Sequence, residues 1–309
     1  MDKGNTLPLL AIVGATASGK SKLAQALADQ WRASLVSVDS RKVYRGLDIG
    51  TAKPSREAIA TYDYGMVDIV DPDQPFSADD YCKQARALVA ERLDRGERVI
   101  LVGGTGFYLE AFRNGLAELP DIDPAIRQAV QDEAERDGWP SIHREMSEVD
   151  PEWAAEIAPN DRTRLQRAAE LYRQTGTTLS QWLRQSRSEP APWPMVVIEV
   201  VHPREELHHR IAERTDKMIA MGLADEVKSL LEKGYTANDP GLATVGYVET
   251  IDFLGGALTA DHWREQIIIH TRQYAKRQRT WFRQRDYATP LPMNDAVQQE
   301  VTRIIERSE

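Results

Sequence analysis

The chain has 309 residues, of which 41% are hydrophobic and 28% are charged. This ordinary apolar content excludes disorder of the chain as a whole and allows one large domain or two modest ones. No apolar run approaches the roughly 18 residues of a membrane span, and a single cysteine, Cys82, excludes an intrachain disulfide framework. Because the first residues run directly into an apolar stretch, we expect no signal peptide, a reducing cytosolic compartment and no membrane partner.

Short apolar runs alternate with amphipathic stretches over the first 110 residues. This alternation predicts an α/β fold with a doubly wound parallel sheet and crossover helices. The expected strands are Leu9–Val13, Leu35–Val38, Met66–Val70, Val99–Val102 and, after a long detour, Val196–Val201. The expected helices include Lys20–Trp31, Ala78–Leu93 and a short last helix at Val297–Ile305.

The composition and the hydrophobic pattern of the sequence change between residues 115 and 194, where the chain is charged and carries four of its tryptophans. Helical patterns occur there without a convincing strand, so we expect a helical insertion domain at 115–194. The core would then consist of 1–114 and 195–309, and its second part would be mostly helical.

The strongest motif follows the first expected strand and opens the first expected helix. It fits G-x-x-x-x-G-K-S and consists of Gly14, Ala15, Thr16, Ala17, Ser18, Gly19, Lys20 and Ser21. The glycines allow successive backbone N–H groups to face an anion, and the helix start adds its positive dipole end. Lys20 would reach the outer phosphate and Ser21 would ligate Mg²⁺. The motif predicts a P-loop NTPase-like core that binds a di- or triphosphate.

A second acidic strand end of the kind that holds Mg²⁺ in P-loop NTPases is absent from its usual place. The strand Val99–Val102 ends instead in a glycine-rich turn that contains Thr105, whereas Asp39 follows the strand Leu35–Val38. Ligands of open α/β sheets bind beyond the carboxyl ends of the strands, so Asp39, Thr105 and the phosphate loop should converge. A strand-end aspartate is also common as a turn former or helix cap, and the pattern alone leaves both interpretations open.

The formal net charge of −9 argues against a polyanionic partner, but the charge is unevenly distributed. Between residues 271 and 285 the chain has six cationic residues and no acidic one. Four of them fall at i, i+4, i+7 and i+11 on one helix face, and we call them the basic stripe: Arg272, Lys276, Arg279 and Arg283. Such a face, interrupted by aromatic residues, suits a nucleic-acid backbone with unstacked bases. A solvated helix with a buried aromatic side is the alternative.

Five segments together resemble the bacterial tRNA dimethylallyltransferase family, also called tRNA isopentenyltransferases. They are Gly14–Ser21, Asp39–Pro54, Gly103–Tyr108, Pro159–Asp161 running on to Arg164 and Arg167, and Thr271–Arg283. The resemblance covers nearly the whole chain in the order of the family, and its second and last segments are specific.

The resemblance implies transfer of a dimethylallyl group from dimethylallyl diphosphate to an exocyclic amine in tRNA. The acceptor would be the adenosine immediately 3′ of the anticodon, and diphosphate would be released. The phosphate loop and Mg²⁺ would then cradle a diphosphate. Asp39 matches the general base, Lys20 and Arg214 match charge-neutralising groups, and Thr105 matches a donor to the departing oxygen.

The same resemblance implies that the anticodon stem-loop contacts three stretches of the chain and that Thr105 and Arg127 lie near the extruded base. The implied contacts are Asp39, Ser40, Arg41, Lys42, Thr105, Arg127, Thr163, Arg164, Leu165, Gln166, Arg167, Lys276, Arg277, Gln278, Arg279, Thr280, Trp281, Phe282 and Arg283. The family often has glutamine at positions 42 and 163 and proline at position 15, so this chain departs from its pattern there. We expect a monomer.

Two other functions remain open at this point. A P-loop small-molecule kinase would turn over ATP with a small acceptor and would not bind dimethylallyl diphosphate. A non-catalytic, nucleotide-dependent RNA-binding protein would change its RNA affinity with GTP or ATP and form no covalent product.

Overall fold

Five parallel strands form the core sheet, in the order β2-β3-β1-β4-β5. Their bounds are Leu9–Gly14 (β1), Ala33–Val38 (β2), Arg98–Gly103 (β3), Met195–Val201 (β4) and Ala288–Pro292 (β5). The computed structural model describes residues 8–186 and 188–308. Strands β1 and β2 are buried along their whole length, as expected of a parallel sheet that helices cover on both faces. The predicted doubly wound α/β architecture is confirmed.

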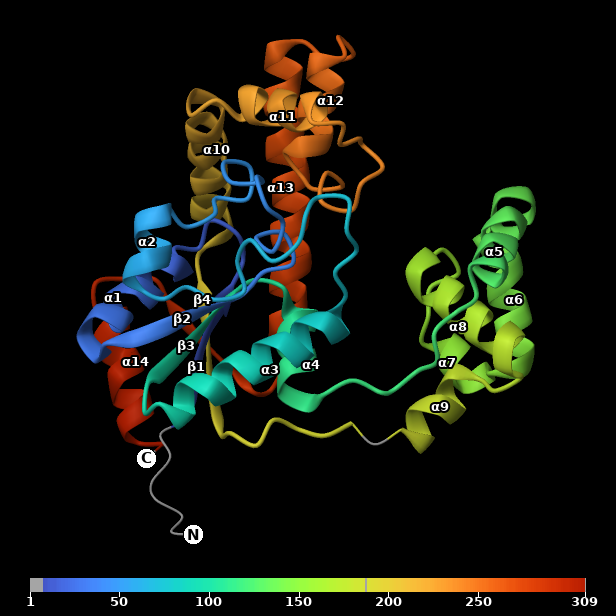
Figure 1. Cartoon of the computed structure of the whole chain (residues 1–309), viewed down its shortest axis with the longest axis horizontal. Coiled ribbons are helices and arrows are strands. Elements are labelled where there is room, and N and C mark those ends of the chain that lie inside the picture. Colours follow the sequence, from blue (N-terminus) through green and yellow to red (C-terminus); the bar gives the residue numbers. More distant parts are fainter. Residues whose placement is uncertain (1–7, 187, 309) are drawn as a thin grey trace. The chain divides into compact units, whose positions relative to one another are not determined.

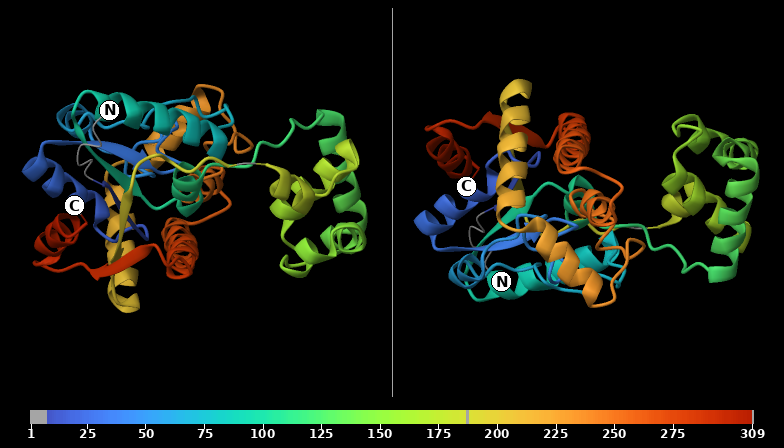
Figure 2. Two further views of the ribbon diagram at one scale, coloured as in Figure 1. Left: turned by 90° about the horizontal axis from the view of Figure 1, so that it is seen from below. Right: turned by 90° about the horizontal axis from the view of Figure 1, so that it is seen from above.

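Helices cover the sheet in two layers (Figures 1 and 2). One face packs on α3 (Ala78–Asp94) and α4 (Gly106–Asn114), with Phe282 from the end of α13 (Ala260–Arg283). The opposite face packs on α1 (Lys20–Trp31) and α14 (Val297–Glu306).

Further helices lie beyond the carboxyl ends of the strands. Their bounds are Arg204–Ala220 (α10), Leu223–Glu232 (α11) and Tyr247–Leu254 (α12), and a short helix α2 spans Arg56–Thr61. Apolar residues of α10, α11, α12 and α13 form a core of their own with the loop that follows β2. This packing fixes that loop relative to α10 and α13.

The described chain forms two compact units: the segments up to Arg113 and from Ala191 onward, and Asn114–Pro190. The second unit contains helices at Pro124–Asp137 (α5), Trp139–Val149 (α6), Pro151–Ala155 (α7), Arg162–Thr175 (α8) and Leu179–Gln185 (α9). They enclose their own apolar cluster. The expected insertion ended four residues later, at Pro194; in the structure Ala191 N donates to Arg113 O at 2.8 Å, within the first unit.

Two sequence expectations about strands are wrong. Met66–Val70 is not a strand: Met66 and Asp68 have φ values of +59° and +55°, which break the extended backbone, and only isolated bridges form nearby. Strand β5 was missed because it is mostly exposed and carries two prolines, which an edge strand tolerates. No helix among residues 8–186 and 188–308 is long and apolar enough to cross a membrane.

Candidate active site

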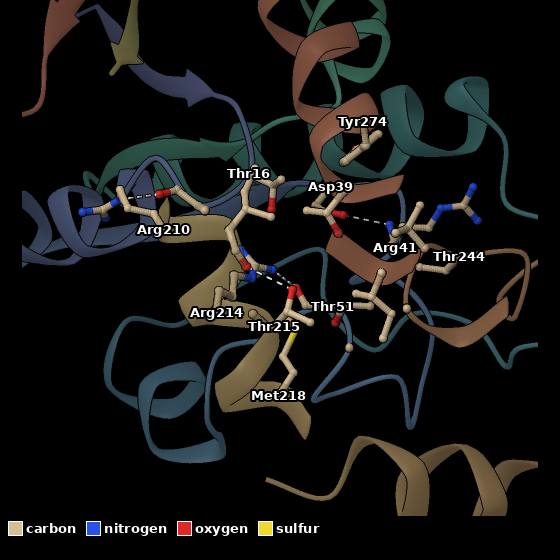
Figure 3. A pocket seen from close by; sticks show the side chains of 18 of the residues that line it. Thr16, Asp39, Arg41, Thr51, Arg210, Arg214, Thr215, Met218, Thr244 and Tyr274 are labelled. Atoms are coloured by element: carbon tan, nitrogen blue, oxygen red, sulfur yellow. Dashed lines mark hydrogen bonds between the residues drawn. The ribbon is translucent and has the colours of Figure 1, made fainter. Parts of the chain in front are cut away.

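The carboxyl ends of β1 and β2 open into a cavity of about 640 Å³ that α10 and α13 also line. Asp39 comes from the end of β2, Thr16 from the phosphate loop, Arg214 from α10 and Tyr274 from α13 (Figure 3). Segments that are far apart in the sequence therefore meet at one crevice, as the topology of open parallel sheets requires.

The phosphate loop has the backbone that its glycines permit. Gly14 has a φ of +144°, and a Cβ there would lie 2.7 Å from Val200 O of the neighbouring strand. Gly19 has a φ of +87° and immediately precedes α1. The N–H groups of Ala17 and Gly19 have no hydrogen-bond partner in the described part of the chain. They are available to an anion at the start of α1.

Two carbonyl groups of the same loop accept hydrogen bonds from side chains on α10 or just before it. Arg210 Nε of α10 donates to Ala17 O at 2.8 Å, and His202 Nε2 lies 2.8 Å from Ser18 O. The other ring nitrogen of His202, Nδ1, lies 2.8 Å from Glu206 Oε1. These contacts satisfy two loop carbonyls and so stabilise the loop conformation in which its N–H groups are available for anion binding.

Gln278 of α13 joins the phosphate loop to the loop after β3. Its Oε1 accepts from Thr16 N at 2.8 Å, and its Nε2 donates to Gly104 O at 2.9 Å. The side chain is buried, so neither bond competes with bulk water.

We expect Gln278→Leu to lower the free energy of unfolding by about 1–3 kcal/mol, because it leaves the buried Thr16 N and Gly104 O without partners. Equilibrium denaturation measures this change. Lys228→Met, at an exposed position of α11, serves as the surface control and should change stability by less than about 0.5 kcal/mol. An unchanged stability of Gln278→Leu would mean that the two backbone groups find other partners.

Among the cationic side chains that line the cavity, burial lowers the pKa of three that have no counter-ion in contact: Lys20, Lys42 and Arg214. None forms an ion pair among the described residues, and Asp39 lines the same cavity. Burial, together with the neighbouring Lys42 charge, lowers the pKa of Lys20 to about 7. Burial also lowers the pKa of Lys42 and of Arg214, while Asp39 opposes the shift in both. An excess of buried positive charge of this kind fits an anionic ligand.

The loop that carries Asp39 is held by local hydrogen bonds. Asp39 Oδ1 accepts from Arg41 N at 2.9 Å, and Thr105 Oγ1 accepts from Ser40 N at 3.0 Å. The Tyr274 and Thr105 side chains are hydrogen-bonded, and burial with the nearby Asp39 charge raises the pKa of Tyr274 to about 12. The structure brings Asp39, Lys20, Ser21 and Arg214 to the cavity wall. Thr105 does not line the cavity, so its expected hydrogen bond to the departing oxygen stays a prediction.

The expected tRNA contacts divide into exposed and buried side chains. Lys276, Arg277, Arg279 and Arg283 are exposed on α13, and Thr163 and Arg164 are exposed on α8 of the second unit. Also in that unit, Arg127 Nε pairs with Glu170 Oε1 at 3.3 Å, Gln166 Nε2 donates to Glu170 Oε1 at 2.8 Å, and Arg167 Nη2 donates to Pro120 O at 3.3 Å. Ser40, Arg41, Thr280 and Trp281 are partly buried, while Lys42 is buried against the cavity.

Three of the expected contact residues have side chains that are buried in the protein, so a contact of their segments with tRNA, which stays a prediction, would involve neighbouring side chains. Leu165 packs in the apolar cluster of the second unit, and Phe282 packs under the core sheet. Gln278 is buried and engaged at both ends of its amide. A helix that binds RNA with one face must bury its other face, and the expected segments included both.

Sequence reasoning missed His202 and Arg210. Both contact carbonyl oxygens of the phosphate loop, yet neither belongs to a recognisable sequence motif. One signal was present: His202, Glu206, Arg210 and Arg214 are spaced by four residues, which places the last three on one face of α10. That pattern is shared by many solvated charged helices, so only the position of α10 beside the loop distinguishes it.

The fold and the cavity define a P-loop-type α/β protein with an anion site and one strand-end carboxylate. The IPP transferase family model matches residues 42–285. The chain belongs to the IPP transferase family.

Individual relatives agree with this assignment. A tRNA dimethylallyltransferase of Geobacter sulfurreducens is 42% identical over 280 residues, which cover 91% of this chain and 90% of the relative. One of Methylococcus capsulatus is 43% identical over 286 residues, with 92% of each chain covered. The crystal structure of a tRNA isopentenylpyrophosphate transferase from Bacillus halodurans matches with a TM-score of 0.71 and 33% identity over 98% of both chains.

Proposed function

We propose that this enzyme transfers a dimethylallyl group from dimethylallyl diphosphate to the exocyclic amine of an adenosine in tRNA. The acceptor is the adenosine immediately 3′ of the anticodon. The observation that carries the proposal is the cavity itself, in which unpaired cations and free loop N–H groups face the carboxylate of Asp39. Curated relatives that are named tRNA dimethylallyltransferases support the same reaction.

The chemistry assigns a role to each group. A bond forms between the amine nitrogen and the first carbon of the prenyl group, while the bond from that carbon to the diphosphate oxygen breaks. The amine proton passes to Asp39, which acts as the general base. The diphosphate leaves with the bonding electron pair, and Lys20, Arg214 and the loop N–H groups neutralise its growing charge.

A magnesium ion fits the residues that are present. Ser21 lines the cavity, and its hydroxyl has no hydrogen-bond partner among the described residues, so one oxygen ligand is available. No group of three or more His, Cys, Asp or Glu residues in the described chain could enclose a metal ion. Mg²⁺ is commonly bound by few protein oxygens together with phosphate oxygens. We propose that Ser21 ligates it and that it adds positive charge at the leaving diphosphate.

The direct test is incubation with unmodified tRNA, dimethylallyl diphosphate and Mg²⁺, followed by mass analysis of the nucleosides. The expected product is a dimethylallylated adenosine from the anticodon loop. Stoichiometric consumption of ATP with a small acceptor would instead support the kinase, and RNA binding without a covalent product would support the RNA-binding protein. A monomeric state and a cytosolic location stay predictions.

We further propose that the basic stripe binds tRNA phosphates. Lys276, Arg279 and Arg283 are exposed and form no ion pair in the described part of the chain. We expect the double substitution Lys276→Ala and Arg279→Ala to weaken tRNA binding regardless of tRNA sequence. The slope of log affinity against log salt should become shallower by up to about 1.5 units.

Measurements of tRNA affinity over a series of salt concentrations, on wild type and on the double variant, give the two slopes to be compared. Removing two exposed cations outside the stripe, Lys228 on α11 and Lys233 directly after it, by Lys228→Ala and Lys233→Ala, is the charge-matched control and should leave the slope unchanged. If the stripe variant keeps the wild-type slope, the stripe is a solvated face and the RNA binds elsewhere.

A further inference from the structure

Lys42 is the least compensated charge of the cavity. The residue is 9% exposed, lines the cavity, and its ammonium forms no hydrogen bond or ion pair with any described residue. Lys53, whose side chain is 2% exposed, differs in this respect: its Nζ lies 2.7 Å from Asp48 Oδ1 and 2.6 Å from Asp68 Oδ1. A buried ammonium without partners is costly, so it is retained where a ligand supplies the partner.

The charges around Lys42 identify the ligand class. Asp39 is the carboxylate that acts on its ammonium, whereas Lys20, Arg214 and Lys53 repel it. Lys53 is already neutralised by its two aspartates, so the charges that act on one another around Lys42 are three cations, Lys20, Lys42 and Arg214, and the carboxylate of Asp39. Five further cationic side chains and one further carboxylate, Glu213, also line the cavity, so its lining keeps an excess of positive charge. A ligand with at least two negative charges, small enough for about 640 Å³, balances this excess.

We propose that Lys42 is a third protein cation for the diphosphate of the prenyl donor, acting together with Lys20 and Arg214. Position 42 therefore serves the donor site in this chain, and it does not read a base of the tRNA. The inference rests on the proposed function only for the identity of the anion, because diphosphate binding is measurable without the transfer reaction.

The test is binding of inorganic diphosphate with Mg²⁺ to wild type, Lys42→Met and Lys42→Gln. Both variants remove the charge, and the second keeps a polar group. We expect the dissociation constant to rise about tenfold or more in both, as for the loss of one charged hydrogen bond. Dimethylallyl diphosphate should show a similar rise in KM, and the KM for tRNA should stay within about twofold of wild type. Lys228→Met removes one exposed charge from α11 and should leave the diphosphate affinity unchanged.

Thermal unfolding without ligand separates this role from a structural one. Removing an uncompensated buried charge should keep or raise the melting temperature of Lys42→Met, whereas a structural lysine would lower it. Wild-type diphosphate affinity in both variants, a changed KM for tRNA alone, or a lower melting temperature would each overturn the proposal. If wild type binds diphosphate more tightly than both variants but modifies no tRNA, the proposed function fails and the role of Lys42 stands.

Discussion

The variant Asp39→Asn is expected to transfer the prenyl group about 10²–10⁴-fold more slowly than wild type, while its tRNA affinity stays nearly unchanged. The amide cannot take the proton that the amine loses. It still offers Oδ1 to Arg41 N, the hydrogen bond that shapes this loop at 2.9 Å in the structure. Single-turnover rates and equilibrium tRNA binding measure the two effects separately.

Asp39→Ala is the companion variant, because it removes both the proton acceptor and the loop hydrogen bond. If loop geometry alone mattered, Asn would behave as wild type and Ala would be impaired. If the proton acceptor matters, prenyl transfer should be slow in both the Asn and the Ala variant. Near wild-type turnover in both variants would remove Asp39 from the mechanism.

Lys20→Met is expected to lower kcat/KM for dimethylallyl diphosphate by about 10²–10³. In the structure Lys20 Nζ donates to Ala15 O at 3.0 Å and lines the cavity, where it would meet charge that grows in the transition state. Steady-state kinetics with varied donor at saturating tRNA measures the change, and the KM for tRNA is the internal control. An unchanged kcat/KM would place the diphosphate away from the phosphate loop.

The same residue predicts a pH dependence. The pKa of Lys20 lies at about 7, because burial and the charges of Lys42 and Arg214 lower it more than Asp39 raises it. The ammonium is therefore charged below pH 7 and loses its proton as the pH rises through 7. Diphosphate affinity of the free enzyme should fall over that range, and Lys20→Met should lack this decline. A wild-type affinity that is flat from pH 6 to 8 would contradict the lowered pKa.

The sequence identified those parts of the fold whose signal is local. Strand β1, the phosphate loop and α1 follow one another with an apolar run, a glycine-rich motif and an amphipathic helix, and each is found at the expected place. Met66–Val70 has an equally apolar pattern, but Met66 packs in the core with a positive φ, which breaks the extended backbone. The local sequence pattern does not indicate this change of backbone conformation. Hydrophobicity predicts burial in this case and does not predict backbone conformation.

The candidate site shows the same division. Lys20 and Asp39 could be selected because a motif or a strand end marks them. The roles that the structure gives Arg210 and Gln278 could not be predicted, since they depend on which loop a distant helix packs against, at sequence separations of 193 and 262 residues. Lys42 was placed in the right loop, but the sequence alone did not show that its side chain is buried at the cavity and unpaired.

The hydrogen bonds of Gln278 restrict how the tRNA-binding face of α13 can change in this enzyme. Position 278 lies on the helix that presents the basic stripe, yet a new side chain there must first satisfy Thr16 N and Gly104 O. Most substitutions would fail this requirement before any altered RNA contact could be selected. On α13, variation that changes the strength of tRNA binding is therefore expected at exposed positions such as Lys276 and Arg279, whose substitution leaves the buried hydrogen bonds of Gln278 intact.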